Sequence, residues 1–172
     1  MEFESKILSK SISEMLYNSD KTLGTAESCT GGRIAEAIIS VPGASDYFKG
    51  GIVSYTNEVK ESILGVSHQV LEEQTAVCEE VAKEMVIGAI KVLNVDYAVS
   101  ATGVAGPTGG TPEIPVGTIW IGYGSKDEVR TVKLSEDFGR DINLAIATTA
   151  LKSILSFLQE HEEELKNEKN QE

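Results

Sequence analysis

The chain has 172 residues, of which 41% are hydrophobic and 24% charged, enough for one hydrophobic core and too few for two ordinary domains. These proportions are typical of a globular protein and exclude a disordered or membrane-embedded chain. The net charge of −12 argues against a general duplex-binding surface, because lysine and arginine supply most non-specific affinity for nucleic acids.

The N-terminus and the cysteines bear on the cellular compartment. Residues 1–6 include acidic side chains and form neither a basic leader nor an apolar run, so we expect no secretory signal, no membrane span and a cytoplasmic location. Cys29 and Cys78 lack metal-ligand spacing and are expected to be free thiols. We expect one domain over residues 1–160 and a charged, frayed tail over residues 161–172.

Hydrophobic periodicity and turn residues predict helices that alternate with strands. In chain order, we expect a helix over 8–16, a strand over 23–27, a helix opened by 28–32, a strand over 51–55, a helix over 57–64, a helix over 77–94, a strand over 95–100, a hairpin of strands over 118–123 and 128–134, and a last helix from 140. Asn57 is the expected cap of its helix, and His68 is placed in a linker. This alternation predicts an α/β layered domain with helices on both faces of a mixed sheet.

Helical spacing also predicts which side chains face the core. The inward residues are Ile34, Ala35 and Ile38 in the second helix, Val81, Met85, Ala89 and Val92 in the helix over 77–94, and Leu144, Ala147, Leu151, Leu155 and Leu158 in the last helix.

The first candidate site is the segment Ala26-Glu27-Ser28-Cys29-Thr30-Gly31-Gly32, at a strand-to-helix junction. Backbone N–H groups at such a junction, aided by the positive end of the helix, suit a phosphate or a developing oxyanion. The alternative is that Ser28 or Thr30 only caps the helix while the glycines form a tight turn.

A serine nucleophile here would need a base, and the chain has only His68 and His161, so a Ser-His-Asp triad is improbable. Lysine with a lowered pKa is the usual substitute, and Lys60 is the candidate, with Tyr55 five residues earlier. The strand-to-helix turn between them would let the two converge. Each also has an ordinary interpretation, Lys60 as a solvated helix residue and Tyr55 as a half-buried strand residue.

The third element is Ser100-Ala101-Thr102-Gly103-Val104-Ala105-Gly106-Pro107-Thr108-Gly109-Gly110, a strand that runs into a glycine-rich loop. Glycines let a backbone approach a ligand closely, although a flexible surface connection is equally compatible with them. Ligands of α/β sheets collect beyond the carboxyl ends of strands, where Ser28, Tyr55 and Thr102 are all expected. Walker, Gly-x-Ser-x-Gly and histidine or cysteine metal motifs are absent, so we expect neither metal nor cofactor.

Together, Thr25–Gly32, Gly51–Lys60 and Thr102–Pro107 resemble the CinA C-terminal family, and the likeness extends over roughly residues 5–158. Pro115-Val116-Gly117-Thr118-Ile119-Trp120 and Phe138-Gly139-Arg140-Asp141 agree with it as well. The family is known for nicotinamide-nucleotide amidases, which convert nicotinamide mononucleotide and water to nicotinate mononucleotide and ammonia.

The resemblance implies a three-layer α/β/α sandwich with a mixed, mostly parallel sheet, similar to the anticodon-binding-domain architecture. It implies Ser28 as nucleophile, Lys60 and Tyr55 as its proton-handling partners, and Thr102 and Arg140 as polar active-site residues. The remaining expected substrate-binding residues are Thr30, Gly31, Gly32, Gly103 and Gly106. Arg140, or less favourably Arg33, would hold the nucleotide phosphate through a bidentate contact.

The leading hypothesis is therefore a metal-independent amidase that stands alone, without the N-terminal pyrophosphatase-like domain of longer family members, and that forms homo-oligomers by resemblance only. The alternative from another class is a non-catalytic module that senses a pyridine nucleotide. A third interpretation, a structural subunit that docks through its acidic helix, is supported only by the charged tail.

Overall fold

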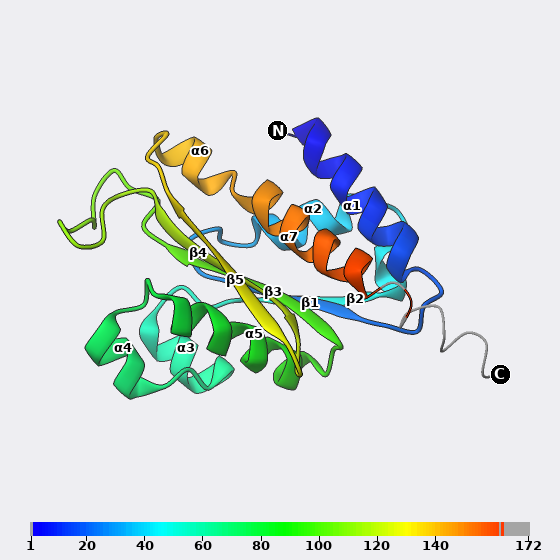
Figure 1. Ribbon diagram of the computed structural model, residues 1–172, viewed down its shortest axis with the longest axis horizontal. Helices are drawn as coiled ribbons and strands as arrows, with labels where there is room; N and C mark the ends of the chain where they lie inside the picture. Colours follow the sequence, from blue (N-terminus) through cyan, green and yellow to red (C-terminus); the bar gives the residue numbers. More distant parts are fainter. Residues whose placement is uncertain (1, 162, 164–172) are drawn as a thin grey trace.

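The computed structural model describes residues 2–161 and 163, which form a five-stranded sheet with helices on both faces (Figure 1). The sheet order is β2-β1-β3-β4-β5. The strands are β1 (Leu23–Glu27), β2 (Phe48–Val53), β3 (Tyr97–Gly103), β4 (Thr118–Ser125) and β5 (Val129–Ser135). β1 pairs in parallel with β2 and β3, whereas the β3–β4 and β4–β5 pairs are antiparallel. The mixed α/β fold is confirmed, but its pairings are half parallel rather than mostly so.

The helices divide between the two faces of the sheet (Figure 1). One face is covered by α1 (Glu2–Leu16), α2 (Arg33–Ile39), α6 (Arg140–Leu144) and α7 (Ala147–Glu160). The other is covered by α3 (Asn57–Leu64), α4 (His68–Gln74) and α5 (Glu79–Leu93), and a short 3-10 helix spans Ala44–Asp46. Each face has its own apolar core, centred on residues such as Ile12, Ile121 and Leu151 on the first side and Val81, Met85 and Ala89 on the second.

The strand order places a topological switch point at β1. The chain leaves β1 through α2 on one face to reach β2, and leaves β2 through α3, α4 and α5 on the other face to reach β3. β1 therefore lies between two parallel neighbours whose connections run in opposite directions. In open α/β sheets this arrangement opens a crevice beyond the carboxyl ends of the strands, where ligands bind.

Several predicted boundaries differ from the structure because tertiary contacts, not local patterns, set them. The second strand begins at Phe48 and ends at Val53, so Tyr55 lies beyond it. Thr56, not Asn57, caps α3, since its hydroxyl accepts a hydrogen bond from the Val59 amide. The expected linker at His68 is the start of α4, which Ser67 caps in the same way.

Two of the predicted helices also differ from what the sequence predicted. Val92 is exposed near the end of α5, while Val81, Met85 and Ala89 are buried as expected. The last helix is interrupted between α6 and α7. The Asn143 side chain explains the separate α6, because its Nδ2 donates to the carbonyl of Ala105 and so attaches this short helix to the glycine-rich loop.

By length and composition alone, residues 140–160 qualify as a membrane-spanning helix. Within α7, however, Leu151, Ile154 and Leu158 are fully buried in the core of the first face. A core helix passes the same test, and packing against the sheet accounts for the apolar character of this one. Of the predicted charged tail, residues 162 and 164–172 lie outside the described residues.

Candidate active site

A cavity of about 360 Å³ lies at the carboxyl ends of β1 and β3, beside the switch point. Its walls come from five segments that are far apart in the sequence. They are Ser28 and Cys29, then Tyr55, Asn57 and Lys60, then Ala76 and Val77, then Thr102–Gly106 with Thr108 and Gly109, and finally Arg140. Ligand-binding sites typically occupy cavities of this size, about 300–1,000 Å³.

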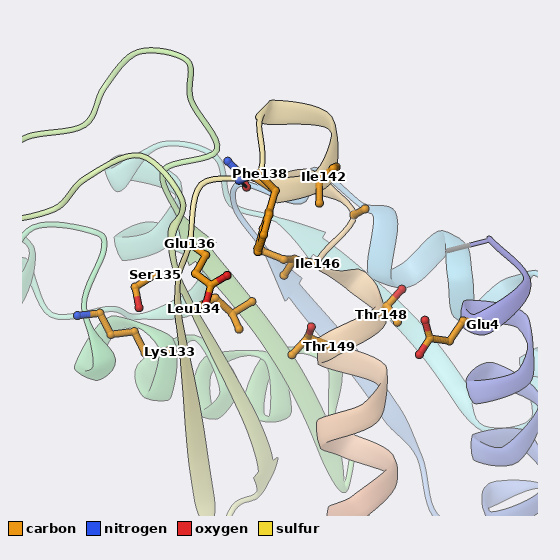
Figure 2. A pocket seen from close by; sticks show the side chains of 12 residues that line it. Glu4, Lys133, Leu134, Ser135, Glu136, Phe138, Ile142, Ile146, Thr148 and Thr149 are labelled. Carbon is orange, nitrogen blue, oxygen red and sulfur yellow. Dashed lines mark hydrogen bonds between the residues drawn. The ribbon is translucent and has the colours of Figure 1, made fainter.

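A second cavity, of about 460 Å³, lies between β5, α6 and α7 and lacks a comparable reactive pair. Figure 2 shows Phe138 reaching toward Ile146 above Leu134, with Glu4 and Thr148 at the far end. Lys133 and Ser135 also line it, but Lys133 extends away, and its ammonium lies 5.5 Å from the centre of the Trp120 ring. This cavity is therefore not the candidate active site.

The first cavity contains a buried serine–lysine pair. Lys60 Nζ lies 2.9 Å from Ser28 Oγ, across 32 residues of sequence. The Lys60 side chain is 1% exposed and Ser28 is 8% exposed. Ser28 directly follows β1, and Lys60 lies on the inner side of α3, so the pairing of β1 with β2 brings the two together.

Two main-chain carbonyls orient the lysine amine. Lys60 Nζ donates to the carbonyl of Ser54 at 2.7 Å and to that of Tyr55 at 3.4 Å. A carbonyl oxygen can only accept hydrogen bonds. When the amine is neutral, its two N–H groups therefore remain on these carbonyls, and its lone pair is directed at Ser28 Oγ. This is the orientation that a general base for the serine needs.

Burial increases the neutral fraction of the Lys60 amine near physiological pH. Desolvation lowers the pKa of Lys60 from the ordinary value of 10.5 to about 8. None of its three hydrogen-bond partners is a carboxylate that would hold the proton in place. With this pKa, about a tenth of the lysine is neutral at pH 7.

The turn after β1 is held by Glu27, whose carboxylate is 1% exposed. Its Oε2 accepts hydrogen bonds from Thr30 Oγ1 (2.6 Å), Gly32 N (3.0 Å) and Ile34 N (3.1 Å), and its Oε1 accepts one from Ala35 N (2.9 Å). Gly32 adopts a left-handed conformation (φ 101°) that is strained for other residues. The N-terminus of α2 is thus already occupied by an anion and does not suit a phosphate.

Other backbone amides around the cavity remain available. In the part of the chain that the structure describes, the amides of Cys29 and Thr30 donate to no oxygen acceptor. The same holds for the amides of Ala105, Gly106 and Thr108 in the glycine-rich loop. Cys29 and the three loop residues line the cavity, whereas Thr30 does not.

Cys29 adjoins the serine but is poorly suited to be a nucleophile. Burial raises the pKa of its thiol to about 12, so the thiol stays protonated at neutral pH. Both Cys29 and Cys78 are free cysteines, as the sequence predicted.

Tyr55 is in the cavity wall, but not in the position expected for a proton-handling partner. Its side chain is 69% exposed, and only its main-chain carbonyl contacts Lys60. The reason is that β2 ends at Val53 and the chain turns before α3, which directs Lys60 inward while the phenol faces solvent.

The other predicted substrate-binding residues fall into two groups. Thr102, Gly103, Gly106 and Arg140 line the cavity, whereas Thr30, Gly31 and Gly32 do not. The Thr102 hydroxyl donates a hydrogen bond of 2.7 Å to the carbonyl of Ala76. This bond fixes the part of the cavity wall that precedes α5. Arg140 donates to the carbonyl of Gly106, which fixes its guanidinium at the rim.

Arg33 belongs with the second group. It is not among the cavity-lining residues, and its guanidinium donates to the carbonyl of Thr30.

Sequence reasoning missed several residues of the site. Glu27 was passed over although a charged residue at the end of a short buried strand is a usable signal. Asn57, Ala76 and Val77 were not expected in the site, and no local pattern distinguishes them, whereas Thr108 and Gly109 belong to the glycine-rich loop that the sequence singled out. The described residues contain no group of three or more histidine, cysteine or acidic side chains placed to bind a metal ion.

Comparison with known proteins shows the family of this chain. The family model described as the CinA C-terminal domain matches residues 5–159. The chain belongs to this family. A CinA-like protein of Leptospira borgpetersenii is 55% identical over 114 residues, which are 66% of this chain and 27% of that protein. A CinA-like protein of Cytophaga hutchinsonii is 40% identical over 153 residues, 89% of this chain and 37% of that protein. The CinA domain described here thus spans well under half the length of these curated relatives.

Solved structures show that the fold is shared over nearly the whole domain. The competence/damage-inducible protein CihA of Agrobacterium tumefaciens superposes with a TM-score of 0.86 at 34% identity, covering 90% of this chain and 95% of that one. A CinA-superfamily protein of Escherichia coli gives a TM-score of 0.81 at 34% identity, covering 90% and 88%. The expected resemblance and the α/β fold are both confirmed by these comparisons.

Proposed function

We propose that this CinA domain is a serine amidohydrolase that converts nicotinamide mononucleotide and water to nicotinate mononucleotide and ammonia. The observation that carries the proposal is the buried contact of 2.9 Å between Ser28 Oγ and Lys60 Nζ. A serine is a weak nucleophile unless an adjacent base takes its proton, and a lysine with a lowered pKa is such a base. Family membership supports the nucleotide substrate.

In the proposed first step, neutral Lys60 takes the Ser28 proton while Oγ attacks the carboxamide carbon. The carbonyl oxygen becomes an oxyanion, which the amide of Cys29 in the cavity wall would stabilise. Removing one such donor typically costs about 3–4 kcal/mol of transition-state stabilisation. Lys60 then passes its proton to the leaving nitrogen. The C–N bond breaks, ammonia departs, and an ester between Ser28 and the nicotinate remains.

In the second half, Lys60 takes a proton from water as the water oxygen attacks the ester carbon. The ester bond breaks, and the proton returns to Ser28, which restores the starting state. A bulk water can reach the pair through the open mouth of the cavity, beside the exposed Tyr55. Each proton removed in this cycle is returned, so no other reactant is needed.

The phosphate of the substrate would bind on the loop side of the cavity. The carboxylate of Glu27 excludes a second anion from the N-terminus of α2. The glycine-rich loop instead offers the free amides of Ala105, Gly106 and Thr108, and Arg140 adds its guanidinium. Arginine suits a phosphate because its planar fork donates two parallel hydrogen bonds.

The test is ammonia release from nicotinamide mononucleotide by the wild-type chain and by Ser28→Ala. The matched control is Ser135→Ala, which removes an exposed serine that lines the other cavity together with Lys133. We expect release by the wild type and the control, and none above background by Ser28→Ala. Tight binding of the nucleotide without ammonia release from the wild type would instead support the non-catalytic sensing module.

A further inference from the structure

Glu27 is a buried carboxylate that the proposed proton transfers do not use. It directly precedes Ser28 and is almost fully buried. A buried charge is costly unless hydrogen bonds and local dipoles compensate it. Here all four donors are neutral groups, and three of them are amides at the N-terminus of α2, where the helix dipole favours an anion.

The donors to Glu27 belong to the segment that carries the nucleophile. They come from Thr30, Gly32, Ile34 and Ala35, so one carboxylate connects the end of β1 to the start of α2. The Ser28 amide donates to the carbonyl of Ala101 in β3 at 2.9 Å. The main chain of the nucleophile is therefore held on one side by β3 and on the other by the carboxylate network.

The same network decides which amides of the turn stay free. Glu27 takes the amides of Gly32, Ile34 and Ala35, and the amides of Gly31 and Arg33 donate to the carbonyls of Ser28 and Thr30. Among the described residues of this turn, only the amides of Cys29 and Thr30 are left without an oxygen acceptor. They are the two that follow the nucleophile directly.

We propose that Glu27 is a positioning residue, whose carboxylate holds the turn so that Ser28 Oγ stays in contact with Lys60 and the amide of Cys29, which lines the same cavity, faces the developing oxyanion. The inference rests on the proposed function of Ser28 as nucleophile. Glu27 acts through Ser28 and does not touch the reacting atoms. A displacement of about 1 Å in such a site can cost about 100-fold in rate.

Asp96 provides a matched control at the opposite end of the same sheet. Its carboxylate accepts hydrogen bonds from Thr22 N (2.8 Å) and Thr22 Oγ1 (3.0 Å), just before β1. Asp96 therefore also accepts hydrogen bonds from a backbone N–H group and a threonine hydroxyl, but it lies far from the nucleophile. Glu27 accepts four such hydrogen bonds and Asp96 two, and only loss of the Glu27 carboxylate is expected to disturb Ser28.

The experiment compares Glu27→Gln with Asp96→Asn in the full chain. Each substitution keeps the size of the side chain but replaces one acceptor oxygen by an NH₂ group. That group cannot accept a hydrogen bond from a backbone N–H group. Steady-state kinetics on nicotinamide mononucleotide give kcat and KM, and thermal unfolding gives Tm. A second readout is the rate at which an alkyl fluorophosphonate modifies Ser28, followed by mass spectrometry. In that reaction an Oγ–P bond forms, the P–F bond breaks, fluoride leaves, and Lys60 takes the serine proton.

For Glu27→Gln we expect kcat and the modification rate both to fall about 30- to 100-fold, while KM changes less than about threefold. For Asp96→Asn we expect a lower Tm with kcat and modification rate within about threefold of the wild type. If Glu27→Gln does not fold, Thr30→Val removes only the shortest bond to Glu27, and Thr22→Val is its counterpart at Asp96. Thr30→Val should lower both rates about tenfold, and Thr22→Val should not.

The outcomes separate this inference from the proposed function. If the wild-type protein is modified at Ser28 but releases no ammonia, nicotinamide mononucleotide is not its substrate. The modification rates of the two variants still decide the role of Glu27. Equal rate losses in Glu27→Gln and Asp96→Asn, or losses no greater than the unfolded fraction, would overturn the positioning role. A wild-type Ser28 that the fluorophosphonate does not modify would overturn it too.

Discussion

The two ends of the central strands use the same kinds of side chain in different ways. At the amino end, Lys21 lies 3.9 Å from the Asp96 carboxylate and keeps 23% of its side chain exposed. At the carboxyl end, Lys60 is buried and its partners are a hydroxyl and two carbonyls. The carboxylate at this end, Glu27, is committed to the amides of α2 instead.

The difference shows how a lysine becomes reactive. An ion pair stabilises the ammonium, whereas burial among neutral acceptors destabilises it and lowers the pKa of Lys60. Because the turn after β1 directs Glu27 into α2, the negative charge next to Ser28 does not pair with the lysine. The amino end is accordingly a structural contact between Thr22 and Asp96, and the carboxyl end is a candidate catalytic site.

The largest expected effect separates the two lysines directly. Lys60→Met should lower kcat for ammonia release about 10²- to 10⁴-fold, the usual contribution of a general base. Lys21→Met, which removes the lysine at the other end, should stay within about threefold of the wild type. Steady-state assays on proteins shown to be folded by circular dichroism check this. A Lys60→Met enzyme with near-normal kcat would mean that another group activates Ser28.

A pH–rate profile tests the charge state of Lys60. Since the neutral amine is the base, kcat/KM should rise about tenfold per pH unit below its pKa of about 8 and level off above it. The rise should be the same in Lys21→Met. A rate that is flat between pH 6 and 9 would contradict the base assignment.

The same pKa shift has a consequence for stability. Because the pKa of Lys60 is lower in the folded state, the unfolded chain binds more protons between about pH 8 and 10.5, and the free energy of unfolding should rise with pH across that window. The contribution is on the order of 3 kcal/mol. Urea unfolding at several pH values measures it. Lys60→Met should lack this rise and Lys21→Met should keep it; a rise of equal size in both variants speaks against Lys60 as its source.

The smallest expected effect concerns Cys29, which adjoins the nucleophile. Its raised pKa keeps the thiol protonated, so Cys29→Ala should keep kcat within about threefold of the wild type. The ammonia assay measures this, with Ser28→Ala as the inactive reference. Loss of turnover in folded Cys29→Ala together with an active Ser28→Ala would exchange the roles of the two residues.

The sequence by itself determined most of the local structure. Strand β1 and the end of α3 at Gly65 match the predicted bounds, because a short apolar run and a left-handed glycine are decided by neighbouring residues. The hairpin of β4 and β5 and the position of Ser28 at a strand-to-helix turn were predictable for the same reason. The motifs that resemble the CinA family lie in these segments.

Only the tertiary structure decided how the segments meet. Ser28 and Lys60 come together because β2 pairs with β1 on the side opposite to β3, an order that no local pattern specifies. The end of β2 at Val53 then decided that Lys60 faces inward and Tyr55 outward, because the chain turns before α3 and Lys60 lies on the buried side of that helix. The burial of Glu27 likewise depends on where α2 packs, so its role could not be derived from sequence spacing. The pKa of Lys60 was decided in the same way, because desolvation is a property of the packed site and not of the residue.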